Sequence, residues 1–124
     1  PLPKGFALTN VDESSFEHWL RCLPMKPKGT PIKLFNGKKK MLQALNGGVL
    51  DIDVGKTDLQ QCADAVMRLR AEYLYSKGNH SDIHFNYTSG FKAEYSKWRQ
   101  GFKIGVKGNH VYYYKKSLSN TSYY

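Results

Sequence analysis

The sequence predicts an α+β (or mixed α/β) fold, in which a long helix packs on a small, mainly antiparallel sheet. An apolar stripe at helical spacing over Thr57–Ser76 predicts that helix. Apolar and polar residues alternate over Ile83–Tyr87, the pattern of a half-buried strand. Gly108-Asn109 separates two further strand-like runs and predicts a hairpin. Helical and strand patterns mixed along one chain favour the α+β class.

The composition is that of one compact domain spanning residues 1–124. Of the 124 residues, 40% are hydrophobic and 14% aromatic, which is sufficient for a core and argues against a disordered tail. The net charge of +9 predicts attraction to polyanions, with ordinary solvated lysines as the alternative. No recognised nucleic-acid-binding motif accompanies the basic residues, so no specific nucleic-acid partner is expected. No apolar run is long enough to span a membrane.

The two cysteines, Cys22 and Cys62, do not make a disulfide framework. Their spacing matches no zinc site, because no Cys-x-x-Cys or nearby pair of histidines accompanies them. We therefore expect neither a metal nor a cofactor.

The first half of the chain is predicted to hold one helix and two strands. Asp12 or Ser14 can cap a helix over Ser15–Leu23, which ends before Pro24. Ile32–Phe35 is predicted as a short strand, followed by a turn at Asn36-Gly37.

The segment Val49–Val54 alternates and predicts a strand with two carboxylates, Asp51 and Asp53, on one face. Thr57 or Asp58 then caps the long helix, which ends near Lys77-Gly78. The segment Phe91–Arg99 is ambiguous, since its aromatic spacing fits a short helix. Phe102–Val106 and Val111–Tyr114 form the predicted hairpin. The residues expected to be buried are Leu50, Ile52, Leu59, Cys62, Val66, Leu69, Phe85 and Trp98.

Cys62 lies near the start of the long helix, where it has two interpretations. Peptide dipoles and free N–H groups at a helix start stabilise a thiolate, which makes Cys62 a candidate catalytic nucleophile. Its position about one turn inside the predicted helix weakens that effect. A small apolar side chain packed in the core is the alternative.

Six further residues are candidates for substrate binding. His84 and Asn86 project from one strand face, and Asp51 and Asp53 from another. Trp98 and Arg99 offer an aromatic and guanidinium surface that can stack on sugars or bases. For each pair, a solvated strand face or ordinary packing is the alternative.

Four long motifs resemble one known family: Asp51–Gly55, Asp58–Tyr75, Ile83–Phe91 and Tyr95–Phe102. They are similar to a bacterial family called domain of unknown function 4846, which is commonest in Bacteroides-type bacteria. Members of that family are longer than this chain, and their second half carries a Gly-His-Ala strand segment. The resemblance therefore implies that this chain is the N-terminal part of a longer family domain, with an exposed edge that invites dimerisation.

The order of a helix cysteine and a later strand histidine is similar to that of papain-like thiol hydrolases. By that analogy, Cys62 is the nucleophile of an amide hydrolase with a peptidoglycan-like substrate, and its base lies in the missing second half. The fragment alone is then inactive. Family members look exported or lipid-anchored, which implies a cell-envelope or periplasmic location.

The alternative function is a noncatalytic module that binds an acidic cell-wall glycan or another polyanion. The basic and aromatic residues expected to contact the polymer are Lys92, Tyr95, Lys97, Arg99 and Lys103.

Overall fold

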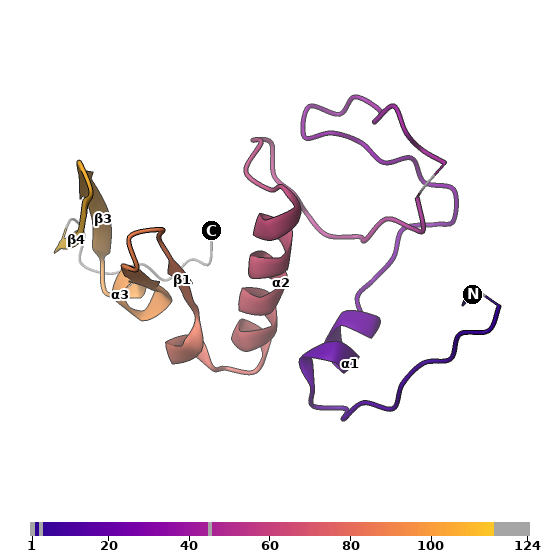
Figure 1. Cartoon of the computed structure of the whole chain (residues 1–124), viewed down its shortest axis with the longest axis horizontal. Coiled ribbons are helices and arrows are strands. Elements are labelled where there is room, and N and C mark those ends of the chain that lie inside the picture. The colour runs from indigo at the N-terminus through magenta and orange to yellow at the C-terminus, as the bar shows by residue number, and fades with distance from the viewer. Residues whose placement is uncertain (1, 3, 45, 116–124) are drawn as a thin grey trace. The chain divides into compact units, whose positions relative to one another are not determined.

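A computed structural model of the chain describes residue 2 and residues 4–44 and 46–115. The chain divides into two compact units, Pro1–Ala65 and Val66–Tyr124. Its helices and two small antiparallel sheets confirm the α+β class (Figure 1). Within the described residues, every helix is too short or too polar to cross a membrane.

The first unit begins with helix α1 (Phe16–Arg21). Its cap is Ser15, whose hydroxyl accepts the N–H of His18 at 3.1 Å. The prediction that Asp12 or Ser14 is the cap was wrong, because the Asp12 carboxylate accepts the N–H of Ser14 at 2.7 Å, outside the helix. The helix ends at Cys22, two residues before Pro24, as proline requires.

Neither strand predicted in the first unit forms. Leu50 makes an isolated bridge with Met25, and the N–H of Asp51 donates to the carbonyl of Pro24 at 2.7 Å. Lys33 likewise bridges Lys39 across the predicted Asn36-Gly37 turn, where Gly37 has φ +80°. Alternation alone does not make a strand, because a ladder needs a neighbour along its whole length.

Helix α2 runs from Cys62 to Ser76 and begins later than the predicted start at Thr57. The carboxylate of Asp64 accepts the N–H of Gln61 at 3.0 Å and so caps the helix. Leu59 is 72% exposed, so no burial stabilises an earlier first turn.

In the second unit, a 3₁₀ turn, η1 (His80–Asp82), leads from α2 into the first sheet. Strand β1 (His84–Asn86) pairs antiparallel with β2 (Lys92–Glu94), in a register that sets Phe85 opposite Ala93. Helix α3 (Tyr95–Arg99) follows β2 without a break. The ambiguous segment is therefore half strand and half helix, because pairing with β1 overrides the helical spacing of its aromatics.

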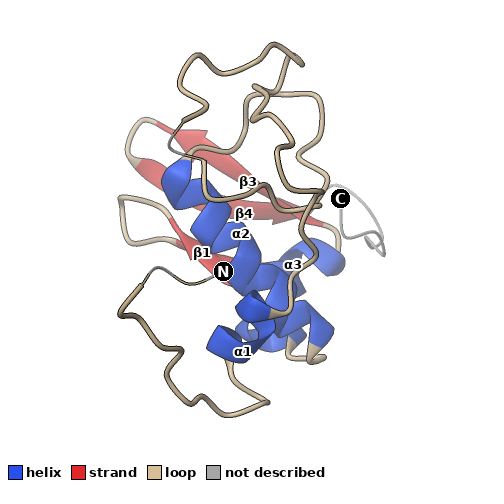
Figure 2. Ribbon diagram, turned by 90° about the vertical axis from the view of Figure 1, so that its right-hand side faces the viewer, coloured by secondary structure: helices blue, strands red, loops and turns tan. Residues whose placement is uncertain are grey.

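The predicted hairpin is confirmed as β3 (Phe102–Lys107) and β4 (His110–Lys115), drawn as paired arrows in Figure 2. Gly108 has φ +59° in the two-residue turn, a conformation that glycine adopts at no steric cost. The hydroxyl of Tyr113 ties the hairpin to β2. It donates to the carbonyl of Lys92 at 2.8 Å and accepts the N–H of Glu94 at 2.7 Å.

Ile83 and Ala71 are the buried hydrophobic side chains among the described residues, at 2% and 5% exposure. Of the eight residues predicted to be buried, Leu50, Ile52, Leu69 and Trp98 are half-buried. The burial prediction was wrong for the other four. Cys62, Leu59, Val66 and Phe85 are exposed. The helical stripe of α2 does not form one buried face, and the charged side chain of Arg70 lies within it.

Candidate functional site

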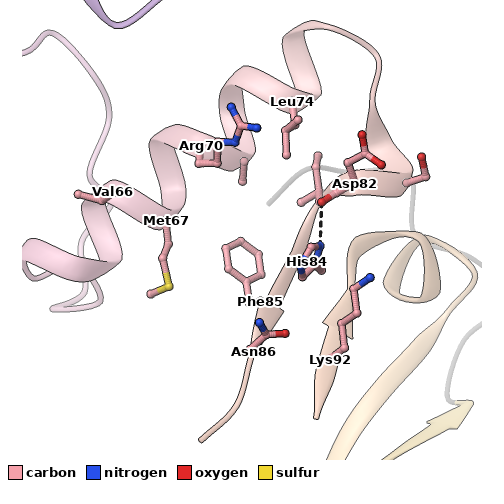
Figure 3. Close-up of a pocket in the computed structure, with 12 residues that line it drawn as sticks. Val66, Met67, Arg70, Leu74, Asp82, His84, Phe85, Asn86 and Lys92 are labelled. Carbon is pink, nitrogen blue, oxygen red and sulfur yellow. Dashed lines mark hydrogen bonds between the residues drawn. The ribbon is translucent and has the colours of Figure 1, made fainter. Parts of the chain in front are cut away.

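A cleft of about 710 Å³ in the second unit separates α2 from the sheet formed by β1 and β2. Figure 3 shows its lining side chains, with Met67 of α2 and Phe85 of β1 extending into the space between helix and strand. The lining residues are Val66, Met67, Arg70, Ala71, Leu74, Ser81, Asp82, Ile83, His84, Phe85, Asn86 and Lys92. All twelve belong to the second unit, so the cleft is complete within it.

The wall of the cleft that α2 supplies follows helical spacing. Val66, Arg70 and Leu74 are four residues apart and therefore lie on one helix face. The lining also contains apolar side chains, of which Ile83 is the most buried hydrophobic residue described.

Two cations and one carboxylate line the cleft: Arg70, Lys92 and Asp82. The guanidinium of Arg70 also lies 5.2 Å from the centre of the Tyr73 ring, a cation–π contact on the helix itself. The excess of positive over negative side chains favours an anionic ligand.

His84 and Asn86, which the sequence places on one strand face, both line the cleft. The Nδ1 of His84 lies 2.9 Å from the carbonyl oxygen of Asp82, shown by the dashed line in Figure 3. A carbonyl only accepts hydrogen bonds, so Nδ1 carries the proton and Nε2 of the neutral ring is an acceptor. His84 can therefore accept a hydrogen bond from a ligand hydroxyl.

Trp98 and Arg99 lie on α3, outside the cleft lining. Trp98 stacks on Tyr95 with ring centres 5.6 Å apart, and the Nη1 of Arg99 donates to Nδ1 of His80 at 3.0 Å. His80 in turn stacks on Tyr75 at 4.7 Å. Burial raises the pKa of Tyr95, with Tyr75 adding to the rise and Arg99 opposing it. These contacts fasten α3 to the end of α2, and both candidates take part in packing.

Asp51 and Asp53 belong to the first unit and do not line the cleft. Asp51 lies 3.7 Å from the ammonium group of Lys26, and both side chains are exposed. The carboxylate of Asp53 accepts the N–H of Gly55 at 2.8 Å and shapes a turn. Local structure therefore accounts for both carboxylates.

Cys62 is a free, exposed thiol at the first residue of α2. Because the helix starts later than predicted, Cys62 lies in its first turn and not one turn inside. The lining of the cleft begins at Val66 and does not include Cys62.

The sequence analysis assigned no site role to Cys22 or His18, but the structure brings the two together. The Sγ of Cys22 lies 3.4 Å from Nε2 of His18, and the thiol is exposed. The available signal was their spacing of four residues, which places both on one face of α1.

Sequence comparison supplies a family for the chain. The sequence model of the family described as Domain of unknown function (4846) matches residues 1–124. The comparisons with curated proteins and with solved structures gave no match. The chain therefore belongs to the family of domain of unknown function 4846.

Proposed function

We propose that this protein is a cell-envelope module that binds an acidic glycan in the cleft between α2 and β1. The observation that carries the proposal is the cleft itself, whose lining combines Arg70, Lys92 and His84 with apolar side chains. The net charge of +9 supports it, since a basic protein is attracted to the anionic polymers of an envelope.

The chemistry of the lining suits a sugar that carries carboxylates. Arg70 and Lys92 supply positive charge for the carboxylates, and Nε2 of His84 accepts a bond from a hydroxyl. Asn86 offers both a donor and an acceptor on the same strand. Met67 and Phe85 provide apolar surface for the ring carbons of a sugar.

The change Lys92→Gln tests the proposal at the rim of the cleft. The ammonium group of Lys92 is exposed, so its contribution to the binding free energy should be that of an exposed ion pair. Affinity for polygalacturonate should therefore fall about two- to fivefold. Titration calorimetry at two salt concentrations measures this loss, which shrinks at high salt because ions screen the pair.

The matched control is Lys38→Gln, which removes the same charge from an exposed lysine of the first unit. Equal losses in both variants would show that net charge, and not the cleft, holds the polymer. An absence of salt-sensitive binding by the unaltered protein would end the proposal.

A second candidate function is amide hydrolysis by a papain-like mechanism with Cys62 as the nucleophile. The observation that favours it is the free, exposed thiol at the first residue of α2. Cys62 would attack the carbonyl carbon of a peptidoglycan-like amide, and a histidine base would accept the thiol proton.

The change Cys62→Ser is expected to lower hydrolysis of peptidoglycan by at least about 10³-fold, because the nucleophile is lost. Cys22→Ser is the matched control, since it removes the other exposed thiol and should leave turnover unchanged. Release of new amino groups from the polymer measures the activity. Turnover that survives Cys62→Ser, or no turnover by the unaltered full-length protein, would exclude this function.

A further inference from the structure

One face of the β3–β4 hairpin carries a row of three neighbouring rings, those of His110, Tyr112 and Tyr114. Residues directly opposite in the register share a face, which places Tyr114 with Lys103, Tyr112 with Gly105 and His110 with Lys107. The ring centres of His110 and Tyr112 lie 5.6 Å apart, and those of Tyr112 and Tyr114 lie 6.4 Å apart. We call these six residues the ladder face.

Gly105 explains why the middle ring lies against the strand. A Cβ built on Gly105 would come within 2.6 Å of Cζ of Tyr112, so the ring occupies the space that a side chain would fill. Tyr112 and Tyr114 are nevertheless 39% and 43% exposed. The hairpin therefore holds its rings in place and leaves part of each ring open to a ligand.

The opposite face of the hairpin is used for packing. Tyr113 contacts Phe91 with ring centres 4.9 Å apart, and its hydroxyl binds the backbone of β2. Among the described residues, β3 and β4 form a two-stranded sheet of their own.

The charges on the ladder face indicate the sign and the spacing of the charges that a ligand should carry. Lys103 and Lys107 stand on β3 opposite Tyr114 and His110, and the ammonium group of Lys103 lies 5.7 Å from the centre of the Trp98 ring. Residues 102–115 contain no acidic side chain. Residues 102–115 also contain no arginine. Arginine is the side chain best suited to bind phosphate groups, such as those that every unit of a nucleic acid carries. Sparse lysines beside rings suit carboxylates carried on sugar rings.

From this geometry we infer that the ladder face is a second contact surface for the same polymer, a carboxylated glycan whose sugar rings stack on Tyr112 and Tyr114. The inference rests on the proposed function and adds that the protein selects polyanions built of rings. The C–H bonds of a sugar face pack on the negative face of an aromatic ring, which a polyanion without rings does not provide.

The test compares polygalacturonate with poly-L-glutamate of equal length, which carries carboxylates but no rings. The unaltered protein should bind polygalacturonate more tightly. The double change Tyr112→Ala with Tyr114→Ala should weaken polygalacturonate binding about tenfold, as lost stacking contacts do, and change poly-L-glutamate binding less than about twofold.

Two further variants separate stacking from a folding defect. Tyr112→Phe with Tyr114→Phe keeps both rings and should retain the preference for polygalacturonate. Gly105→Ala pushes the Tyr112 ring aside without removing it and should weaken polygalacturonate binding alone.

Equal loss on both polymers, or no preference in the unaltered protein, would overturn the inference. Tighter binding of an oligothymidylate than of polygalacturonate would overturn it in favour of single-stranded nucleic acid. Lys92→Gln, which should weaken both acidic polymers, reports on the cleft separately. Suppose that Lys92→Gln changes neither affinity, while the ladder-face variants still weaken polygalacturonate binding more than poly-L-glutamate binding. That result would exclude the cleft as the binding site and support the ladder face.

Discussion

Replacing Ile83 by alanine is expected to lower the free energy of unfolding by about 2–5 kcal/mol, the range found for large-to-small changes at buried sites. Ile83 is 2% exposed and lines the cleft. Its backbone carbonyl also accepts the N–H of Tyr95 at 3.0 Å, which ties the entry of β1 to α3. The shortened side chain leaves a cavity where these elements meet. Urea unfolding followed by circular dichroism measures the loss.

The matched control is Val106→Ala on the hairpin, because Val106 is 60% exposed and aliphatic. Its substitution should change the free energy of unfolding by less than about 0.5 kcal/mol. A comparable small effect in both variants would show that Ile83 does not anchor the second unit.

Replacing Tyr113 by phenylalanine is expected to cost about 1–2 kcal/mol of the free energy of unfolding. The ring contacts with Phe91 and Phe102 survive the change, but the hydroxyl that joins two strands is lost. The carbonyl of Lys92 and the N–H of Glu94 then have no partner from the hairpin. Hydrogen exchange at the amide of Glu94 should therefore accelerate together with the loss of stability.

Tyr112→Phe is the control, since this hydroxyl makes no hydrogen bond within the described residues and its loss should be nearly neutral. If Glu94 keeps its protection in Tyr113→Phe, another group must satisfy that amide and the hydroxyl is not the link between hairpin and sheet.

The hairpin and the last part of α2 were predictable because their signals are local. Gly108 adopts the positive φ that the tight turn requires, and the two strands that flank it, β3 and β4, pair with each other. The 15 residues of α2 combine good helix formers with helical spacing, so only the first turn was misplaced. Similarly, alternation put His84 and Asn86 on one strand, and both line the cleft.

The errors in the predicted strands and in the predicted core have a common physical cause, because each depended on partners distant in the sequence. Val49–Val54 alternates as a strand does, yet within the part of the chain that the structure describes only an isolated bridge at Leu50 pairs it with another segment. Burial of Leu59 and Cys62 was inferred from one helix stripe, but both are exposed in the structure. A stripe shows which residues share a face, and only tertiary packing decides whether that face is covered.

By itself, the sequence determined the α+β class, the long helix, the hairpin turn and the family, since each follows from local pattern or from long motifs. Tertiary structure alone decided which side chains meet. It gathered Arg70, Lys92 and His84 into the lining of one cleft of the second unit. It also aligned the ring row on β4 above Gly105. Such contacts depend on strand register and packing between segments, which no local pattern specifies.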